Sequence, residues 1–395
     1  MRATTRILVL LAILASLFSF LKFSHCEKSV WAGPDQYIHA CYSDLPALFS
    51  SRAFGGGQWA YSGGESAVEY PALQGLVMWA TAQISTDSPV TYFRINVIFI
   101  AVLFLFTVLI LHRIRPEYSY LYPLAPTVIA ALYINWDLWA IASMLLAIYW
   151  FDRKSYLPSA VALGVSIATK FFPIFLLLPI AIYFLRKAAF KDGAKYLAIS
   201  LGTFISINIP FAVTAREGWW RFYDLNLHRD ADWGSLWYGL TIFNINIPHI
   251  NYFTILTLLI GVSIVSIFLL QTRETLSLAS SAFYIFVLVM AVGKVYSPQY
   301  ILWLTPLAIL AMKDKRDLPW FWFWQIVEIG YHIAIWQHLA LITDSKYGVG
   351  LKLYGAVALL RIAASLALAI VLARRHRSSG SFPREFLLSS GESYP

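Results

Sequence analysis

The stretch YFRINVIFIAVLFLFTVLILH, residues 92–112, decides the fold class, because Arg94 is its only residue with a full charge at pH 7. An apolar run of about 18 or more residues can cross the hydrocarbon core of a bilayer as a helix. Such runs recur along the 395 residues, of which 59% are hydrophobic and 13% charged, against roughly a quarter charged in a typical soluble domain. The sequence therefore predicts an all-α, polytopic membrane helix bundle. It excludes a cytosolic enzyme, a secreted disulfide scaffold and a disordered chain.

Twelve membrane spans are expected, several of them short. They form one domain over residues 1–375, and residues 376–395 are expected to be a flexible cytoplasmic tail. The first run, 7–23, lacks a small-x-small cleavage site before Cys26, and Lys22 is typical of a side chain that reaches the interface from a helix end. We interpret this run as a transmembrane helix and not as a cleaved signal peptide. The further runs lie at 92–112, 120–135, 138–151, 156–170, 172–185, 196–213, 250–270, 276–293, 299–312, 318–341 and 350–373.

The charges between these runs indicate an orientation. Alternating spans place the N-terminus and six further segments on one face: 113–118, 152–155, 186–195, 271–275, 313–317 and the tail. This face holds more than half of the 30 Lys and Arg residues and fewer than half of the 21 acidic ones. Basic residues concentrate in cytoplasmic loops, so both termini are expected in the cytoplasm of a multi-pass plasma-membrane protein. The net charge of +9 then reflects topology and predicts no nucleic-acid partner.

Two long segments remain outside, at about 24–91 and 214–249. The apolar stretch at 71–84 is too short to span and is expected to form an interfacial or re-entrant helix. The Trp and Tyr residues of the second segment suit the headgroup region. Cys26 and Cys41 both fall in the first segment, where a disulfide would close a loop of about 15 residues and contribute about 3 kcal/mol. The alternative is two unpaired cysteines at an interface.

Cofactor and metal motifs are weak in this sequence. The eight histidines are scattered, and we find no Cys/His cluster, no P-loop and no GxGxxG after a strand. We therefore expect no cofactor and no metal, and any chemistry must use carboxylates, bases and the leaving group of a substrate.

Carboxylates outside the membrane are the candidate bases. Asp44, in CYSDLPALF, opens a short helix, where either Ser43 or Asp44 acts as N-cap. Asp44 is also placed to accept a proton from an attacking hydroxyl at the lipid–water boundary, and the two roles are compatible. Glu69, before Tyr70 and Pro71, orients a sugar, acts as the base itself or is a solvated loop residue. Asp35 and Glu65 are interpreted as solvated charges.

Cations at the external helix ends are candidate contacts for an anionic headgroup. This group consists of Lys170, His228, Arg229 and Lys294, for which the alternative is a side chain that reaches the interface. At the junction NWD, 135–137, Asp137 is expected to cap the next helix more than to bind a substrate hydroxyl.

These residues together resemble a family. The ordered elements CYSDLPALF, VEYPAL, NWDLWA, ATKFFPIFLLLP, HRDADWGSLWY and KVYSPQYILWLTP are similar to actinobacterial glycosyltransferase family 87, of the polytopic GT-C superfamily. They run from Cys41 to Pro306. That family includes polyprenol-phosphate-mannose-dependent α-mannosyltransferases of cell-envelope glycolipid synthesis. In two places the sequence departs from the pattern: Ala72 replaces the second proline of a Tyr-Pro-Pro element, and Phe49 stands where many relatives carry Tyr.

The resemblance implies a GT-C fold with an extracytoplasmic active site, a polyprenyl-phosphate sugar donor held among membrane lipids, and a glycolipid or glycan acceptor. It also implies inversion at the anomeric carbon, and it places the catalytic Asp on Asp44. We expect Arg229, Lys294, His228 and Lys170 to contact the donor phosphate, and Glu69, Tyr70, Tyr296 and Gln299 to contact sugar or acceptor. A transporter or lipid flippase is the alternative, and a scaffold within an envelope assembly is a third interpretation.

Overall fold

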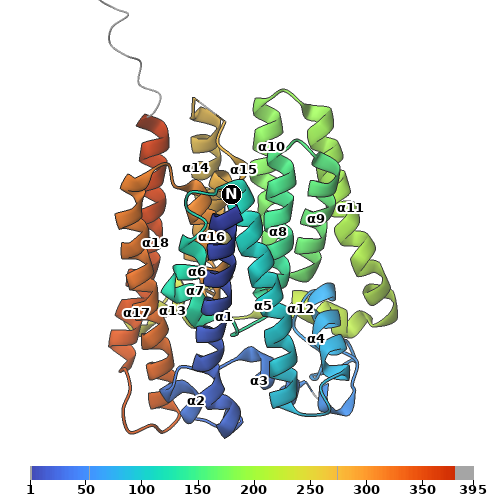
Figure 1. The fold of residues 1–395 in the computed structure, drawn as a ribbon, viewed down its shortest axis with the longest axis vertical. Coiled ribbons are helices and arrows are strands. Elements are labelled where there is room, and N and C mark those ends of the chain that lie inside the picture. The colour runs from blue at the N-terminus through green and yellow to red at the C-terminus, as the bar shows by residue number, and fades with distance from the viewer. Residues whose placement is uncertain (1, 53, 274, 379–395) are drawn as a thin grey trace, which may run out of the picture.

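The computed structural model describes residues 2–52, 54–273 and 275–378, and this part of the chain contains helices and no strand. The prediction of an all-α bundle is confirmed. The long helices lie side by side along the long axis of the molecule (Figure 1). The helices are α1 (Arg2–Ser29), α2 (Asp35–Ile38), α3 (Asp44–Ser51), η1 (Phe54–Gly56), α4 (Ala72–Gln83), α5 (Pro89–Ile114), α6 (Leu121–Leu124), α7 (Pro126–Ala131), α8 (Asp137–Asp152), α9 (Tyr156–Thr169), η2 (Phe172–Leu176), α10 (Leu177–Arg186), α11 (Phe190–Thr214), α12 (Arg216–His228), α13 (Leu236–Ile242), α14 (Ile250–Gln271), α15 (Leu278–Val292), η3 (Pro298–Tyr300), α16 (Ile301–Ala311), η4 (Lys315–Asp317), α17 (Leu318–Ile342) and α18 (Leu351–Ser378).

The apolar helices fit a multi-pass membrane protein. Five of the described helices, α1, α5, α11, α14 and α18, are long and apolar enough to cross a bilayer, and four shorter apolar helices accompany them. The expected span at 120–135 is wrong as a single helix, because the structure divides it into α6 and α7. Pro126 forces this break: it has no N–H to donate, and it holds Ala125 in an extended conformation with ψ of 119°.

Lys22, expected to reach the interface from a helix end, has partners within the protein at this broken element. Its ammonium donates to the carbonyl oxygen of Ala130 at 2.9 Å and lies 4.1 Å from the ring centroid of Phe23. The side chain therefore satisfies a carbonyl near the end of α7 and joins α1 to it.

The basic segments gather at one end of the bundle, toward which the N-terminus and the end of α18 also lie (Figure 1). Arg115 donates to the carbonyl oxygen of Leu310 at 3.2 Å, and Arg186 donates to that of Leu269 at 2.6 Å. Arg375 pairs with Asp314 at 2.8 Å. The segments that alternation assigns to one face thus meet at one end. Of the expected tail, α18 includes 376–378, and 379–395 lie outside the described residues.

The opposite end carries the short helices α2, α3 and α4 (Figure 1). The expected short helix at 71–84 is present as α4, which packs against α5, α9 and α11. Cys26, in the last turn of α1, is joined to Cys41 by a disulfide that ties α1 to the segment before α3. This end of the molecule positions the candidate site.

Candidate functional site

A cavity of about 650 Å³ lies where α3, α8, α9, α12 and η3 approach one another. Its wall is mixed: carboxylates and cations lie on one part, and a group of aromatic and aliphatic side chains forms another. Six residues expected from the sequence line it: Asp44, Glu69, Tyr70, Lys170, Arg229 and Gln299.

The carboxylate of Asp44 is not used to cap α3, because the neighbouring residue caps this helix. Ser43 is the N-cap of α3: its hydroxyl oxygen accepts from the Leu45 N–H at 3.2 Å, and the hydroxyl donates to the carbonyl of Tyr133 at 2.7 Å. The Asp44 N–H donates to the carbonyl of Ile134 at 2.7 Å. Of the two expected caps, the structure therefore uses Ser43, and the Asp44 carboxylate faces the cavity.

Two neutral donors hold this carboxylate. The hydroxyl of Tyr42 donates to Asp44 Oδ1 at 2.8 Å, and Asn135 Nδ2 donates to Oδ2 at 2.6 Å. Burial raises the pKa of Asp44, while these two hydrogen bonds and the positive charge of Lys170 oppose the increase. A carboxylate that is oriented and partly desolvated suits a general base.

Asn135 connects the base to the cationic part of the wall. Its amide nitrogen also donates to the hydroxyl oxygen of Tyr70 at 2.9 Å, and its amide oxygen accepts from Lys170 Nζ at 3.0 Å. The Lys170 ammonium lies 4.4 Å from the centroid of the Tyr70 ring and 3.5 Å from Asp137 Oδ1. One amide therefore joins a base, a hydroxyl and a cation in a single network.

The four carboxylates of the cavity wall differ in their partners. Glu69 forms a two-point pair with Arg52 at 2.7 and 2.9 Å, Asp137 pairs with Lys170, and Asp232 pairs with Arg229. Among the described residues, no Lys, Arg or His lies within 4.0 Å of the Asp44 carboxylate. Asp44 is thus the carboxylate of this wall that has no direct ion-pair partner among the described residues.

The apolar part of the wall comes from η2 and α12 and includes Phe172, Phe175 and Phe222. Tyr300 of η3 stacks on Phe172 with ring centroids 6.1 Å apart. Trp303 also lines the cavity and donates its indole N–H to Asp137 Oδ1 at 2.9 Å. Such a surface can hold a hydrocarbon chain and present ring faces to a sugar.

Three expected contacts do not line the cavity. His228 is exposed and pairs with Asp224 on its own helix at 3.2 Å. Lys294 donates to the carbonyl oxygen of Arg229 at 2.6 Å and therefore holds the backbone of a lining residue. Tyr296 is buried away from the cavity and donates to Glu328 Oε1 at 3.3 Å. Each lies close in sequence to a lining residue, but its side chain turns elsewhere.

Several site residues were missed or misinterpreted. Asp137 is not the cap of α8: it is the first helical residue, and its carboxylate accepts from Trp303. The signal for it was present, because NWD places an amide and a carboxylate between two apolar runs, where polar groups need partners. Tyr42 lacked such a signal, since it lies in the irregular segment before α3, where only Ser43 separates it from Asp44. Other lining residues that were not expected to contact a substrate include Asn135, Asp232, Tyr300 and Trp303.

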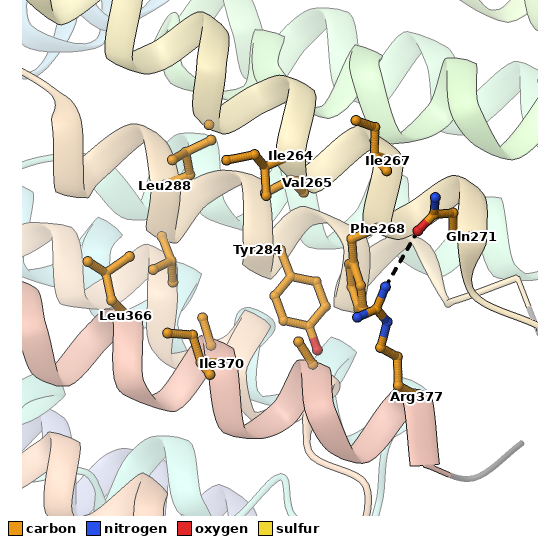
Figure 2. A pocket seen from close by; sticks show the side chains of 14 residues that line it. Ile264, Val265, Ile267, Phe268, Gln271, Tyr284, Leu288, Leu366, Ile370 and Arg377 are labelled. Carbon is orange, nitrogen blue, oxygen red and sulfur yellow. Dashed lines mark hydrogen bonds between the residues drawn. The ribbon is translucent and has the colours of Figure 1, made fainter. Parts of the chain in front are cut away.

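Figure 2 shows a second cavity, of about 500 Å³, between α14, α15 and α18. Its wall is apolar except for Tyr284 and, at one end, Gln271 and Arg377, whose guanidinium donates to the Gln271 amide oxygen at 3.5 Å. No carboxylate is among its lining residues, so it offers no base for a transfer reaction.

Comparisons with known proteins are sparse for this chain. No protein-family model matches it, and no curated protein matches it. Among solved structures it is similar to the crystal structure of ArnT from Cupriavidus metallidurans bound to undecaprenyl phosphate, with 13% sequence identity and a TM-score of 0.47 over 95% of this chain and 78% of that chain. At this level of similarity neither family nor substrate follows, so the function has to be inferred from the cavity.

Proposed function

We propose that the protein is an integral-membrane glycosyltransferase of the GT-C type. It moves a sugar from a polyprenyl-phosphate donor to a hydroxyl of a cell-envelope glycolipid or glycan, on the extracytoplasmic face, and it inverts the anomeric carbon. The observation that carries the proposal is the Asp44 carboxylate, without an ion-pair partner among the described residues, in the same cavity as Lys170 and Arg229. The resemblance to glycosyltransferase family 87 makes mannose the first sugar to test.

The reaction is a single displacement. Asp44 accepts the proton of the acceptor hydroxyl, whose oxygen attacks the anomeric carbon. The bond from this carbon to the phosphate oxygen breaks, and the polyprenyl phosphate leaves with one more negative charge. One base and one displacement give inversion.

Lys170 and Arg229 stabilise that developing charge. Arg229 uses Nη2 for Asp232, which leaves further N–H groups for a phosphate, and Lys170 contacts Asp137 at a long 3.5 Å. The apolar wall at Phe172 and Phe175 suits the first isoprene units of the donor.

The position of the cavity favours transfer over transport. The helices α8 and α9, of 16 and 14 residues, separate it from the basic end by roughly 21–24 Å at 1.5 Å per residue. A transporter site is expected near the midplane, roughly 15 Å from either boundary of a 30 Å core. A site close to one boundary suits a lipid-linked donor and an acceptor that arrives from water.

The decisive experiment supplies purified protein with polyprenyl-phosphate mannose, arabinose or glucose and a membrane-lipid extract, and detects the product by mass. We expect one donor to yield a glycosylated lipid, and Asp44→Asn to lower the rate by about 10²–10⁴-fold, the usual contribution of a general base. Asp224→Asn removes a carboxylate of α12 that lies outside the cavity and serves as the matched control. A folded Asp44→Asn protein with full activity would reject the base assignment.

A transporter predicts a different result. Movement of a labelled lipid or solute across proteoliposomes, with no glycosylated product from any donor, would replace transfer by transport.

A further inference from the structure

Two histidines and one aspartate meet at the end of the molecule that carries α2. His25 lies near the end of α1, Asp35 is the first residue of α2, and His39 follows α2. His25 Nε2 lies 3.0 Å from Asp35 Oδ2, and His39 Nδ1 lies 3.0 Å from Asp35 Oδ1. One donor atom from each residue lies within 4.8 Å of the other two. This cluster has no local sequence pattern, because His25 and His39 are 14 positions apart.

The covalent and packing constraints around the cluster hold its members in place. Cys26, next to His25, is joined to Cys41, two residues after His39. The short helix between them is anchored to α17, since Gln337 Nε2 donates to the carbonyl of Ile38 at 2.9 Å and Tyr37 stacks on Trp336. Donor atoms on a rigid frame bind a cation at little cost in conformational entropy.

The ring geometry suits a shared cation better than two charged imidazoles. The His25 and His39 rings have centroids 3.7 Å apart at an angle of 31°. Two imidazolium ions at this separation repel each other, whereas two neutral rings can direct one nitrogen each toward a metal. The Asp35 carboxylate would offset part of the charge of the cation.

The donor set of two imidazole nitrogens and one carboxylate oxygen is the one that Zn²⁺ and related divalent cations take at sites with an open position. Bonds of about 2.0–2.2 Å in a tetrahedron put neighbouring ligand atoms about 3.3 Å apart. Asp35 Oδ1 lies 3.0 Å from His39 Nδ1 and 3.2 Å from His25 Nε2, so these two contacts need to lengthen by only a few tenths of an ångström. All three side chains are partly exposed, so a water molecule can complete the coordination.

We propose that His25, Asp35 and His39 form a binding site for one divalent transition-metal ion of the Zn²⁺ class, outside the glycosyl-transfer cavity. The site fastens the end of α1 to α2. It also bears on the cavity indirectly, because Tyr37 of α2 stacks on Tyr42 at 5.7 Å, and Tyr42 donates to Asp44. The proposal does not depend on the transferase function, since metal binding is measured without a sugar donor.

The test uses the full chain in detergent, purified without a polyhistidine tag and stripped with a chelator. Titration with ZnCl₂ in a calorimeter is expected to show one equivalent bound, and Co²⁺ is expected to give visible absorption bands that Zn²⁺ abolishes. Loss of partners in the outer shell of a metal typically costs 10–100-fold in affinity. Loss of a ligand in His25→Ala or His39→Ala should therefore weaken binding by at least about 100-fold.

Two further variants separate metal binding from folding. His228→Ala is the matched control. His228 pairs with Asp224 much as His39 pairs with Asp35, but no second histidine among the described residues joins that pair. The His228→Ala protein should therefore bind Zn²⁺ as the unaltered chain does. Asp35→Asn keeps the size of the side chain and should lower Zn²⁺ affinity while the protein elutes as a folded monodisperse species. Absence of stoichiometric binding by the unaltered chain, or equal affinity in His39→Ala, overturns the proposal.

Discussion

At the scale of single residues, Ser43 makes the chemistry of Asp44 possible. The Ser43 hydroxyl at the N-cap of α3 accepts from the N–H of Leu45, so the side chain of Asp44 is not needed as a cap and faces the cavity. The carboxylate then depends on Tyr42 and Asn135 for its orientation and its charge. Both donors lower the pKa of Asp44 against the increase caused by burial, and because they are neutral they do so without forming an ion pair.

Tyr42→Phe tests this dependence through pH. The Tyr42 hydroxyl lowers the pKa of Asp44 against the increase caused by burial, so its removal raises that pKa further. The base is active when ionised; activity is therefore lost as pH falls through the pKa, and this acid limb moves to higher pH in the variant. The measurement is transfer rate against pH under saturating donor. An unshifted limb would contradict the role of Tyr42, and the exposed Tyr252→Phe is the control.

Arg229→Gln tests the phosphate contact. A hydrogen bond to a charged group contributes about 1.5–3 kcal/mol, so the transfer efficiency kcat/KM for the donor should fall by roughly 10–100-fold. The control is Arg216→Gln, an exposed position at the start of the same helix. Equal losses in the two variants would indicate general damage to α12 and remove Arg229 from the site.

The residues found from sequence share one property. Each lies next to a proline, a helix end or the end of an apolar run, where few polar partners are available to a side chain. They are Asp44, Tyr70, Lys170 and Gln299. Sequence could not separate Arg229 from Lys294, since both are cations outside a span. The structure separates them because the Lys294 ammonium is used to hold the Arg229 carbonyl.

At the scale of elements, a buried ion pair fixes the wall that carries Gln299. Arg361 of α18 and Glu328 of α17 are both fully buried, with Arg361 Nε 2.7 Å from Glu328 Oε2. The same guanidinium donates to the carbonyl oxygens of Tyr296 and Ser297, directly before η3. The pair therefore joins three elements at the back of the cavity.

Removal of one partner should destabilise the protein more than removal of both. Arg361→Met leaves the Glu328 charge buried without its cation, at a cost of about 3–5 kcal/mol, whereas Glu328→Leu with Arg361→Met replaces the pair by apolar packing and should recover most of the loss. The measurement is the thermal unfolding midpoint in detergent at one scan rate. Lys352→Met, exposed near the start of α18, is the control. A double variant no more stable than Arg361→Met would argue against an uncompensated charge.

The interruption at α6 and α7 marks the limit of prediction for elements. Hydropathy identifies 120–135 as apolar but does not say where backbone groups find partners once Pro126 breaks the helix. The structure resolves this with a distant residue, Lys22, which donates to Ala130. Contacts across more than a hundred positions leave no local pattern in a single sequence.

At the scale of the whole molecule, the helix bundle and the grouping of its loops could be predicted from two simple rules, because each rule applies to every span. Apolar length locates the helices, and alternation with charge sorts the loops into two groups. The structure collects one group at one end, where Arg115 and Arg186 donate to the last turns of α16 and α14, and Arg375 pairs with Asp314. The cavity did not follow from these rules, since it depends on how short helices such as α3 and α12 pack at the other end.

The orientation in the membrane can be tested with cysteine reporters, because the chain has two cysteines and both are in the disulfide. Lys346→Cys places a thiol in the exposed loop between α17 and α18, and Lys315→Cys places one at the basic end. If positive residues face the cytoplasm, a membrane-impermeant maleimide should label Lys346→Cys on intact cells and Lys315→Cys only after permeabilisation. The reverse pattern would put the cavity on the cytoplasmic side, where an Asp44-dependent transfer would have to use donors and acceptors of the inner leaflet.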